Sequence, residues 1–329
     1  MRFNSTYKQT IGLKDTIKEL ESIKKIIINF YNRKFPLISV DLPTLLEEND
    51  ERLIDHSLIS RPVTVDLGHE YKISKVVQTH SNLLRDMILR LKLKTNEGLY
   101  TTSNYIWRDL PDQTTSSIVK NQITFQFKLS QIQIKDELQK ITLELYDLIY
   151  SLAEDFATKY KLENIYPDKI LTFDSQYLEK EMPNFLPNER ENKTILEYNS
   201  FILKSAGQLL HSGKKHEIIP PELYDLKNHN YILLKDRVNS ETLNVATVAI
   251  LASGTQLVDQ LSLYDANDIL AKDFYKNLIH QTDKIIEVKI NIPALSMAIL
   301  AKGHISEVQS GIFSEEALSL SQKNKIETY

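Results

Sequence analysis

The spacing of apolar residues changes from every second position to every third or fourth position near residue 134. From Ser117 to Ser130 the segment SIVKNQITFQFKLS alternates apolar and polar side chains, which predicts an antiparallel strand with one polar face. From Lys135 to Tyr160 the apolar residues recur at helical spacing. A long amphipathic helix of this kind must pack on a sheet or on a partner chain.

The rest of the chain mixes helices and strands without regular alternation. Helical spacing predicts helices from Thr16 to Tyr31 and from Ser81 to Leu93, and strands are predicted at LISV and RPVTVDL with a polar loop between them. Further strands are predicted at ILTFDSQ, FILKSAGQLL, YILLKD and TLNVATVAILA, and IIEVKINI runs into a helix after Pro293. We therefore expect an α+β fold, with an antiparallel sheet flanked by helices, in a single domain covering residues 1–329.

Composition excludes several classes of protein. The chain has no cysteine, so disulfides, thiolate metal sites and a cysteine nucleophile are impossible, and a reducing cytoplasm is the expected location. A formal net charge of -4 gives no reason to expect a nucleic-acid partner or an anionic membrane surface. No segment has the apolar length that a membrane span needs.

Common nucleotide and hydrolase motifs are missing. There are eight glycines in 329 residues, and neither GxxxxGK[ST] nor GxSxG occurs. The segment GQLLHSG has two glycines but not the strand and helix that a dinucleotide fingerprint requires. Residue patterns alone lead no further than an α+β domain.

Three groups of polar residues have both a structural and a functional interpretation. His211 and His216 in HSGKKHE are five positions apart, which fits no usual metal-ligand spacing, so a solvated loop is favoured. Glu217, Glu222 and Asp225 could bind a cation or a substrate ammonium, although a solvated loop again explains them. Gln122 shares one strand face with Thr124 and Gln126, and this face lines a pocket or meets solvent; both readings stay open.

Three longer segments, in this order and spacing, carry a family resemblance: EGLYTTSNYIWRD, then YPDKI with SQYLEKEMPNFLPNERE, then ALSMAILAKGHISEVQSGIF. With them, the chain from about Thr16 to Phe313 resembles the ammonia-dependent asparagine synthetase, or aspartate-ammonia ligase, family. The resemblance implies a core like that of class II aminoacyl-tRNA synthetases and a homodimer. It also implies ATP-dependent joining of ammonia to aspartate through an aspartyl-adenylate, with Mg²⁺ on the phosphates.

Positions that bind ATP in the family are substituted here. The family has a glycine-rich strand end followed by an arginine, whereas this chain has residues 287–292 as EVKINI and then Ala294 in place of the arginine. We expect the β-branched side chains of this segment to refill the space that glycine leaves open. Further substitutions are Thr124 for an aspartate, Thr242 for a glutamate, Asn244 and Val245 for serines, Thr247 for a glycine, Ala249 for an arginine, and Ile54, next to Asp55, for a loop aspartate.

Four candidates for remnants of a substrate and nucleotide site persist: Gln122, Asp225, Arg108 beside Trp107, and Arg61. No metal site and no cofactor are expected. The leading hypothesis is a paralogue that has lost most ligase activity and serves as a binding or regulatory protein, or as the dimer partner of itself or of an active relative.

Two alternatives remain. One is an active ligase with ATP and Mg²⁺, in which Arg108, Gln122, Asp225 and either Lys289 or Lys214 take over the lost roles. The other is a module that senses amino acids or tRNA, and the net charge weakens its tRNA version.

Overall fold

A computed structural model describes residues 4, 6–54, 56, 58–68, 72–110, 114–130, 132 and 134–329. The chain folds around one eight-stranded sheet with the strand order β1-β5-β6-β11-β10-β9-β8-β7. The strands of this sheet are β1 (Leu37–Ser39), β5 (Gly98–Ile106), β6 (Val119–Leu129), β7 (Leu171–Asp174), β8 (Ser200–Lys204), β9 (Tyr224–Lys235), β10 (Thr242–Leu251) and β11 (Lys284–Asn291). The pairs β1·β5 and β7·β8 at the two edges are parallel, and the five inner pairs are antiparallel. The α+β class and the mainly antiparallel sheet are thus confirmed.

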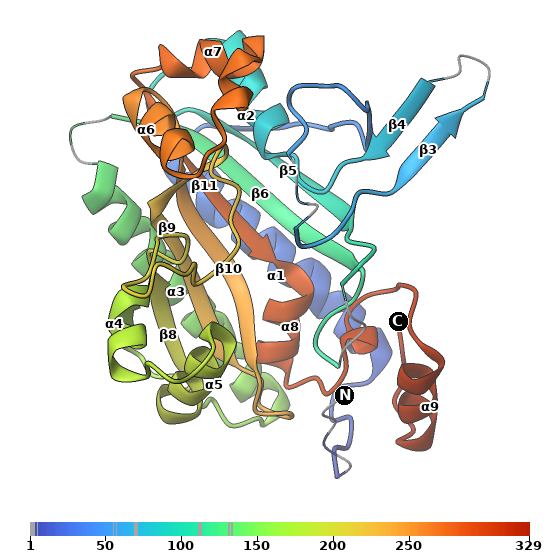
Figure 1. Cartoon of the computed structure of the whole chain (residues 1–329). Helices are drawn as coiled ribbons and strands as arrows, with labels where there is room; N and C mark the ends of the chain where they lie inside the picture. Colours follow the sequence, from blue (N-terminus) through green and yellow to red (C-terminus); the bar gives the residue numbers. More distant parts are fainter. Residues whose placement is uncertain are drawn as a thin grey trace.

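Three helices cover one face of the sheet. They are α1 (Leu13–Lys34), α3 (Ile134–Tyr160) and α8 (Ile292–Leu300), and α1 and α3 pass behind the sheet in Figure 1. Their apolar stripes join Ile123, Phe125 and Phe127 of β6 and Val288 and Ile290 of β11 in the largest core cluster. Successive strand residues alternate between the two faces of the sheet. The apolar residues buried against these helices therefore determine which side chains of each strand lie on the opposite face.

The opposite face carries smaller elements and the connections. They are α2 (Ser81–Arg90), α4 (Ser175–Glu181), α5 (Pro187–Tyr198), α6 (Thr255–Leu263), η2 (Asn267–Ala271) and α7 (Asp273–Ile279). After α8, η3 (Ile305–Glu307) contributes Ile305 to the largest core cluster, and α9 (Glu315–Lys323) lies near the N-terminus (Figure 1). A second sheet of β2 (Leu45–Glu47), β4 (Lys72–Val76) and β3 (Thr64–Leu67) projects from the body (Figure 1). Among the described residues, no helix combines the length and apolarity that crossing a membrane requires.

Several sequence-based boundaries are corrected. The expected polar loop between the first strands contains β2, and the strand expected over RPVTVDL begins only at Thr64. The second helix ends at Arg90 instead of Leu93, because Lys92 takes a left-handed φ of 51°. Helices α4 to α7 were not predicted, since three of them have nine residues or fewer and offer too few turns for a clear helical period.

Candidate functional site

A cavity of about 400 Å³ lies on the face of the main sheet that α1, α3 and α8 leave uncovered. Its floor is formed by Gln122 of β6, Thr247 of β10, and Lys289 and Asn291 of β11. The connection that precedes β9 and the segment around Trp107 form its walls. Gln122 therefore faces a cavity, whereas Thr124 and Gln126, farther along the same strand face, are fully buried.

On the cavity side of β11 the side chains are polar, whereas β-branched side chains were expected there. The β-branched residues Val288 and Ile290 point into the core on the helical side of the sheet. The polar residues between them, Glu287, Lys289 and Asn291, have the opposite orientation because strand side chains alternate. Polar side chains, and not β-branched ones, therefore take the space that glycines would leave open.

A buried polar cluster forms around the ammonium of Lys289. The Nζ atom of Lys289 lies 2.6 Å from the Tyr224 hydroxyl, 2.9 Å from Oγ1 of Thr79 and 3.1 Å from Oε1 of Glu287. The Tyr224 hydroxyl donates to the same carboxylate, and Gln126 Nε2 donates to its other oxygen over 2.6 Å. Burial and the carboxylate of Glu287 raise the pKa of Tyr224 well above its ordinary value. The Lys289 ammonium, the Glu287 carboxylate and the Tyr224 hydroxyl are thus all bonded within the protein, whereas Oε1 of Gln126 has no partner among the described residues.

His229 lies beside this cluster in the cavity lining and is 2% exposed. Burial, with a further contribution from Lys289, lowers the pKa of His229 to about 3. Its Nδ1 atom is buried and has no hydrogen-bond partner among the described residues. The imidazole is therefore neutral at physiological pH, and its buried Nδ1 atom is unpartnered among the described residues.

The outer part of the cavity carries Lys120 and Glu217. The ammonium of Lys120 lies 4.6 Å from the centre of the Trp107 ring, and burial lowers the pKa of Lys120. Burial, followed by repulsion from Glu191, raises the pKa of Glu217 to about 7, although the residue as a whole keeps an exposed edge. Glu217 is thus about half protonated at neutral pH.

The HSGKKHE loop is only partly the solvated loop that was expected. His211 is exposed, but His216 is 4% exposed and its Nε2 atom lies 2.9 Å from Oε1 of Glu191. This contact engages one of the two carboxylates that line the cavity.

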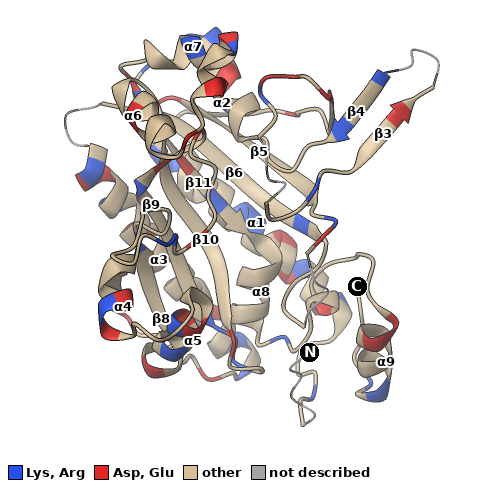
Figure 2. Cartoon of the chain, in the orientation of Figure 1, with Lys and Arg blue, Asp and Glu red and all other residues tan. Residues whose placement is uncertain are grey.

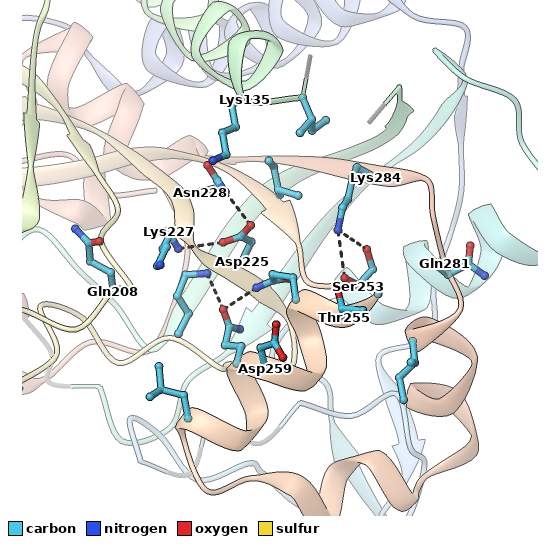
Figure 3. A pocket seen from close by; sticks show the side chains of 18 of the residues that line it. Lys135, Gln208, Asp225, Lys227, Asn228, Ser253, Thr255, Asp259, Gln281 and Lys284 are labelled. Atoms are coloured by element: carbon cyan, nitrogen blue, oxygen red, sulfur yellow. Dashed lines mark hydrogen bonds between the residues drawn. The ribbon is translucent and has the colours of Figure 1, made fainter. Parts of the chain in front are cut away.

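The remnant candidates do not converge on one place. Gln122 lines the cavity, but Asp225 lines a separate pocket near α6 (Figure 3), while its neighbour Tyr224 faces the cavity. Arg61 holds Asp109 with two side-chain bonds of 2.9 and 2.6 Å, and its side chain is 67% exposed. Arg108 lies outside the cavity lining, with Nε 3.9 Å from the same aspartate, and Trp107 occupies the wall instead.

Most of the positions that are substituted relative to the family are buried in the protein interior. Thr124 and Ala249 are fully buried, Ala294 is 4% exposed within the helical core, and Ile54 packs in a second core cluster. Thr242 lines the cavity, where its hydroxyl donates to Oδ1 of Asn192 over 2.8 Å. Strand β10 and helix α8 carry no charged residue along their length (Figure 2). Asp55 lies outside the described residues.

The donor set of the cavity does not fit Mg²⁺, which prefers ionised and accessible carboxylates. Glu191 bonds His216, burial and Glu191 oppose the ionisation of Glu217, and Glu287 is bonded to Lys289 and Tyr224. The acidic trio expected to bind a cation is dispersed, since Glu217 lies in the cavity, Asp225 in the other pocket and Glu222 in the interior. Within the described part of the chain, no group of three or more histidine and acidic side chains could hold a metal ion.

Residues that sequence reasoning missed are Lys120, Tyr224, His229 and the bonded role of Glu287. The alternation of Glu287, Lys289 and Asn291 around buried Val288 and Ile290 was a signal that could have placed these three side chains on the cavity face of the sheet. No comparable signal marked His229, because its position depends on how β9 pairs with β10.

Comparison with known proteins matches residues 14–325 to the family described as aspartate-ammonia ligase. A protein of Malacoplasma penetrans (strain HF-2) with the name aspartate–ammonia ligase is 25% identical over 320 residues, which are 96% of this chain and 98% of the relative. A protein of Bacillus thuringiensis (strain Al Hakam) with the same name is 25% identical over 328 residues, or 98% and 100% of the two chains.

Among solved structures, the fold is similar to that of the asparaginyl-tRNA synthetase of Entamoeba histolytica. The TM-score is 0.63 at 8% identity, over 90% of this chain and 67% of that one. The asparaginyl-tRNA synthetase of Pyrococcus horikoshii, complexed with asparaginyl-adenylate, gives 0.60 at 9% identity, over 90% and 68%. The class II synthetase-like fold is confirmed by these similarities.

Proposed function

Because this chain belongs to the aspartate-ammonia ligase family, we propose that it keeps the family's fold but has lost most of the ATP-dependent ligation of aspartate and ammonia. It serves instead as a binding or regulatory protein, or as a partner in a dimer. The observation that carries this proposal is the cluster in which Lys289 of the cavity floor bonds the buried Glu287 and Tyr224. These side chains fill the segment where the family resemblance implies glycines and a close approach to the nucleotide.

Loss of charge supports the same proposal. The positions at which the resemblance implies arginines are the buried alanines Ala249 and Ala294. Alanine can neither pair with a phosphate nor stack on a base as arginine does. Removing one preorganised transition-state donor typically costs about 100- to 1000-fold in rate, so losing both clamps disfavours adenylate formation.

The alternative of an active ligase needs a rebuilt site. Of the residues proposed for it, Gln122 and Lys289 line the cavity, and Lys289 is already bonded. Asp225 lies in the other pocket, Lys214 is exposed on its loop, and Arg108 lies outside the lining. Within the described residues, the geometry gives the active alternative no complete set of phosphate, metal and ammonium ligands.

A turnover assay tests the proposal. The purified protein is incubated with ATP, Mg²⁺, aspartate and ammonium, and AMP, pyrophosphate and asparagine are measured, with the Bacillus thuringiensis relative as the positive control. We expect product formation lower than that of the relative by about 100-fold or more. Rates within a few-fold of the relative would contradict the proposal and favour the rebuilt ligase.

The proposed dimer is tested separately by sedimentation at micromolar concentration. A homodimer, or a mixed dimer with an active relative, supports the partner role, and a monomer in both experiments contradicts it. We place the protein in the cytoplasm on the basis of its cysteine-free sequence.

A further inference from the structure

A second pocket, of about 860 Å³, lies where β9, β10 and β11 meet α6 and the start of α3 (Figure 3). Among the described residues, it shares no lining residue with the cavity on the sheet face. Its volume is within the range of sites that hold small organic ligands, about 300–1,000 Å³. Its lining combines aliphatic side chains with lysines, aspartates and carboxamides.

Two half-buried charges of opposite sign face this pocket, and neither forms an ion pair with a described residue. The Lys284 ammonium donates to the carbonyl oxygen and to Oγ of Ser253, over 3.2 and 3.1 Å, and both acceptors are neutral. The Asp225 carboxylate accepts from the backbone N–H of Lys227 over 3.1 Å and from Nδ2 of Asn228 over 2.8 Å. The Asp225 carboxylate acts on the Lys284 ammonium through its charge alone and opposes the lowering of the Lys284 pKa by burial, so a ligand with both charges can bridge the two side chains.

The separation of the two strands that carry these charges bears on the type of ligand. Lys284 is on β11 and Asp225 on β9, with β10 between them. Neighbouring strands are about 4.8 Å apart, so the two backbones are about 10 Å apart. A free α-amino acid carries its two charges on one carbon atom, whereas a chain spans up to about 3.5 Å per residue. The spacing fits a dipeptide or a tripeptide with free termini.

Carboxamides in the pocket suit peptide groups, because they both donate and accept hydrogen bonds. Oε1 of Gln256 is buried and has no partner within the described residues, while its Nε2 donates to Oε1 of Gln260 over 2.9 Å. Gln260 is itself anchored to the backbone of β9 through Leu226 N–H. The free oxygen of Gln256 is thus held in place to accept a peptide N–H.

We propose that this pocket binds a short peptide with free termini. The ligand carboxylate pairs with Lys284, its ammonium pairs with Asp225, and a peptide N–H donates to Gln256. Leu226, Ile250 and Leu263 offer apolar contact to the peptide side chains. This site is separate from the cavity with Lys289, so the proposal does not depend on whether ligase activity is lost.

Calorimetry with the full chain tests the proposal through chemically blocked ligands. The probes are Gly-Leu and Gly-Gly-Leu, the N-acetylated and C-amidated forms of each, and free leucine. We expect binding of the unblocked peptides and a loss of affinity of about 10-fold or more from each block, since a hydrogen bond to a charged group contributes about 1.5–3 kcal/mol. Equal binding of blocked and unblocked peptides would overturn the charge pairing. Binding of free leucine as tight as that of the peptides would overturn the assignment to peptides. No heat of binding from any probe at 5 mM would show that the pocket is not a ligand site.

Two variants locate the binding. Lys284→Met is expected to remove the preference for a free carboxylate, and Asp225→Asn the preference for a free ammonium, each with about 10-fold weaker binding. Lys272→Met is the matched control, because Lys272 is an exposed lysine outside the pocket lining. If both pocket variants bind as the control does, the assignment to this pocket is wrong. Since the blocked peptides are tested on unchanged protein, a variant that fails to fold does not decide the outcome.

Discussion

The ammonium of Lys289 lies 3.1 Å from the carboxylate of Glu287, two residues earlier on the same strand. Both side chains point to the cavity side of β11, and their exposed fractions are 13% and 1%. Lys289 of the cavity floor and the buried Glu287 thus neutralise each other. Removing one partner leaves the other as a buried charge, which is costly.

Lys289→Met is therefore predicted to lower the free energy of unfolding by about 3–5 kcal/mol. The physical reason is that Glu287 would keep its bonds to Tyr224 and Gln126 but lose the cation. Chemical denaturation measures this loss. Lys128→Met is the matched control, because Lys128 bonds the half-exposed Asp283 on the neighbouring strand and should cost only about 1 kcal/mol or less.

The double variant Glu287→Gln with Lys289→Met should recover part of the stability lost by Lys289→Met alone, because no buried charge remains unpaired. Additive losses in the double-mutant cycle would show that the two residues do not act as a pair.

Glu217 is predicted to make stability depend on pH. The pKa of about 7 in the folded protein lies above the ordinary glutamate value of 4.5, since burial and Glu191 oppose ionisation while His216 and Lys120 favour it. The free energy of unfolding that Glu217 contributes is highest below pH 4.5, decreases as the pH rises to about 7, and stays low above it.

Glu217→Gln should accordingly stabilise the protein at pH 8 and have little effect at pH 4.5, as measured by urea denaturation at both pH values. Glu163→Gln, at an exposed glutamate outside the cavity, is the control. An equal effect of Glu217→Gln at both pH values would exclude a raised pKa.

Restoring an arginine at position 294 should harm the protein. Ala294 is 4% exposed and packs in the helical core, so Ala294→Arg adds volume and an unpaired charge there. We expect a loss of at least about 3 kcal/mol of unfolding free energy and no gain in ATP binding. Ala271→Arg, at an exposed alanine, should be nearly neutral. Stable folding of Ala294→Arg with ATP binding would mean that the nucleotide site is still open.

Arg61 is predicted to hold Asp109 and not a ligand. Its hydrogen bonds keep the pKa of Asp109 well below the ordinary value, so the stability this pairing gives is present at neutral pH and lost as the pH falls through that pKa. Arg61→Ala should let the pKa of Asp109 rise toward its ordinary value in an NMR titration.

Arg108→Ala is the matched control for that titration. It should shift the pKa of Asp109 much less, because its contact with the carboxylate is 3.9 Å long. Similar shifts from the two variants would show that the Arg61 hydrogen bonds do not dominate.

The main elements could be predicted from local periodicity. The alternation over β6 and the helical spacing over α3 reflect burial against the same core, so these elements matched closely. Helices α4, α6 and α7 could not be predicted, because seven to nine residues offer too few turns for a clear helical period.

The candidate site was less predictable because it depends on which face each strand residue occupies. Asp225 and Tyr224 differ by one position, yet they line different pockets. A shift of one residue in a strand exchanges the two faces, and the sequence around Pro220 and Pro221 gives no periodicity that fixes this register. In β11, by contrast, the apolar residues Val288 and Ile290 indicate which face is buried, so the placement of Lys289 on the cavity face could have been predicted from the sequence.

Calorimetric titration of ATP with Mg²⁺ into the pure protein, with and without aspartate, tests the central claim most directly. The bonded cluster of Glu287, Lys289 and Tyr224 predicts no saturable heat and no rise in Tm at 1 mM ATP. A Kd near 100 μM would instead add about 1.4 kcal/mol of stability at that concentration. Such binding, strengthened by aspartate, would contradict the loss of the nucleotide site.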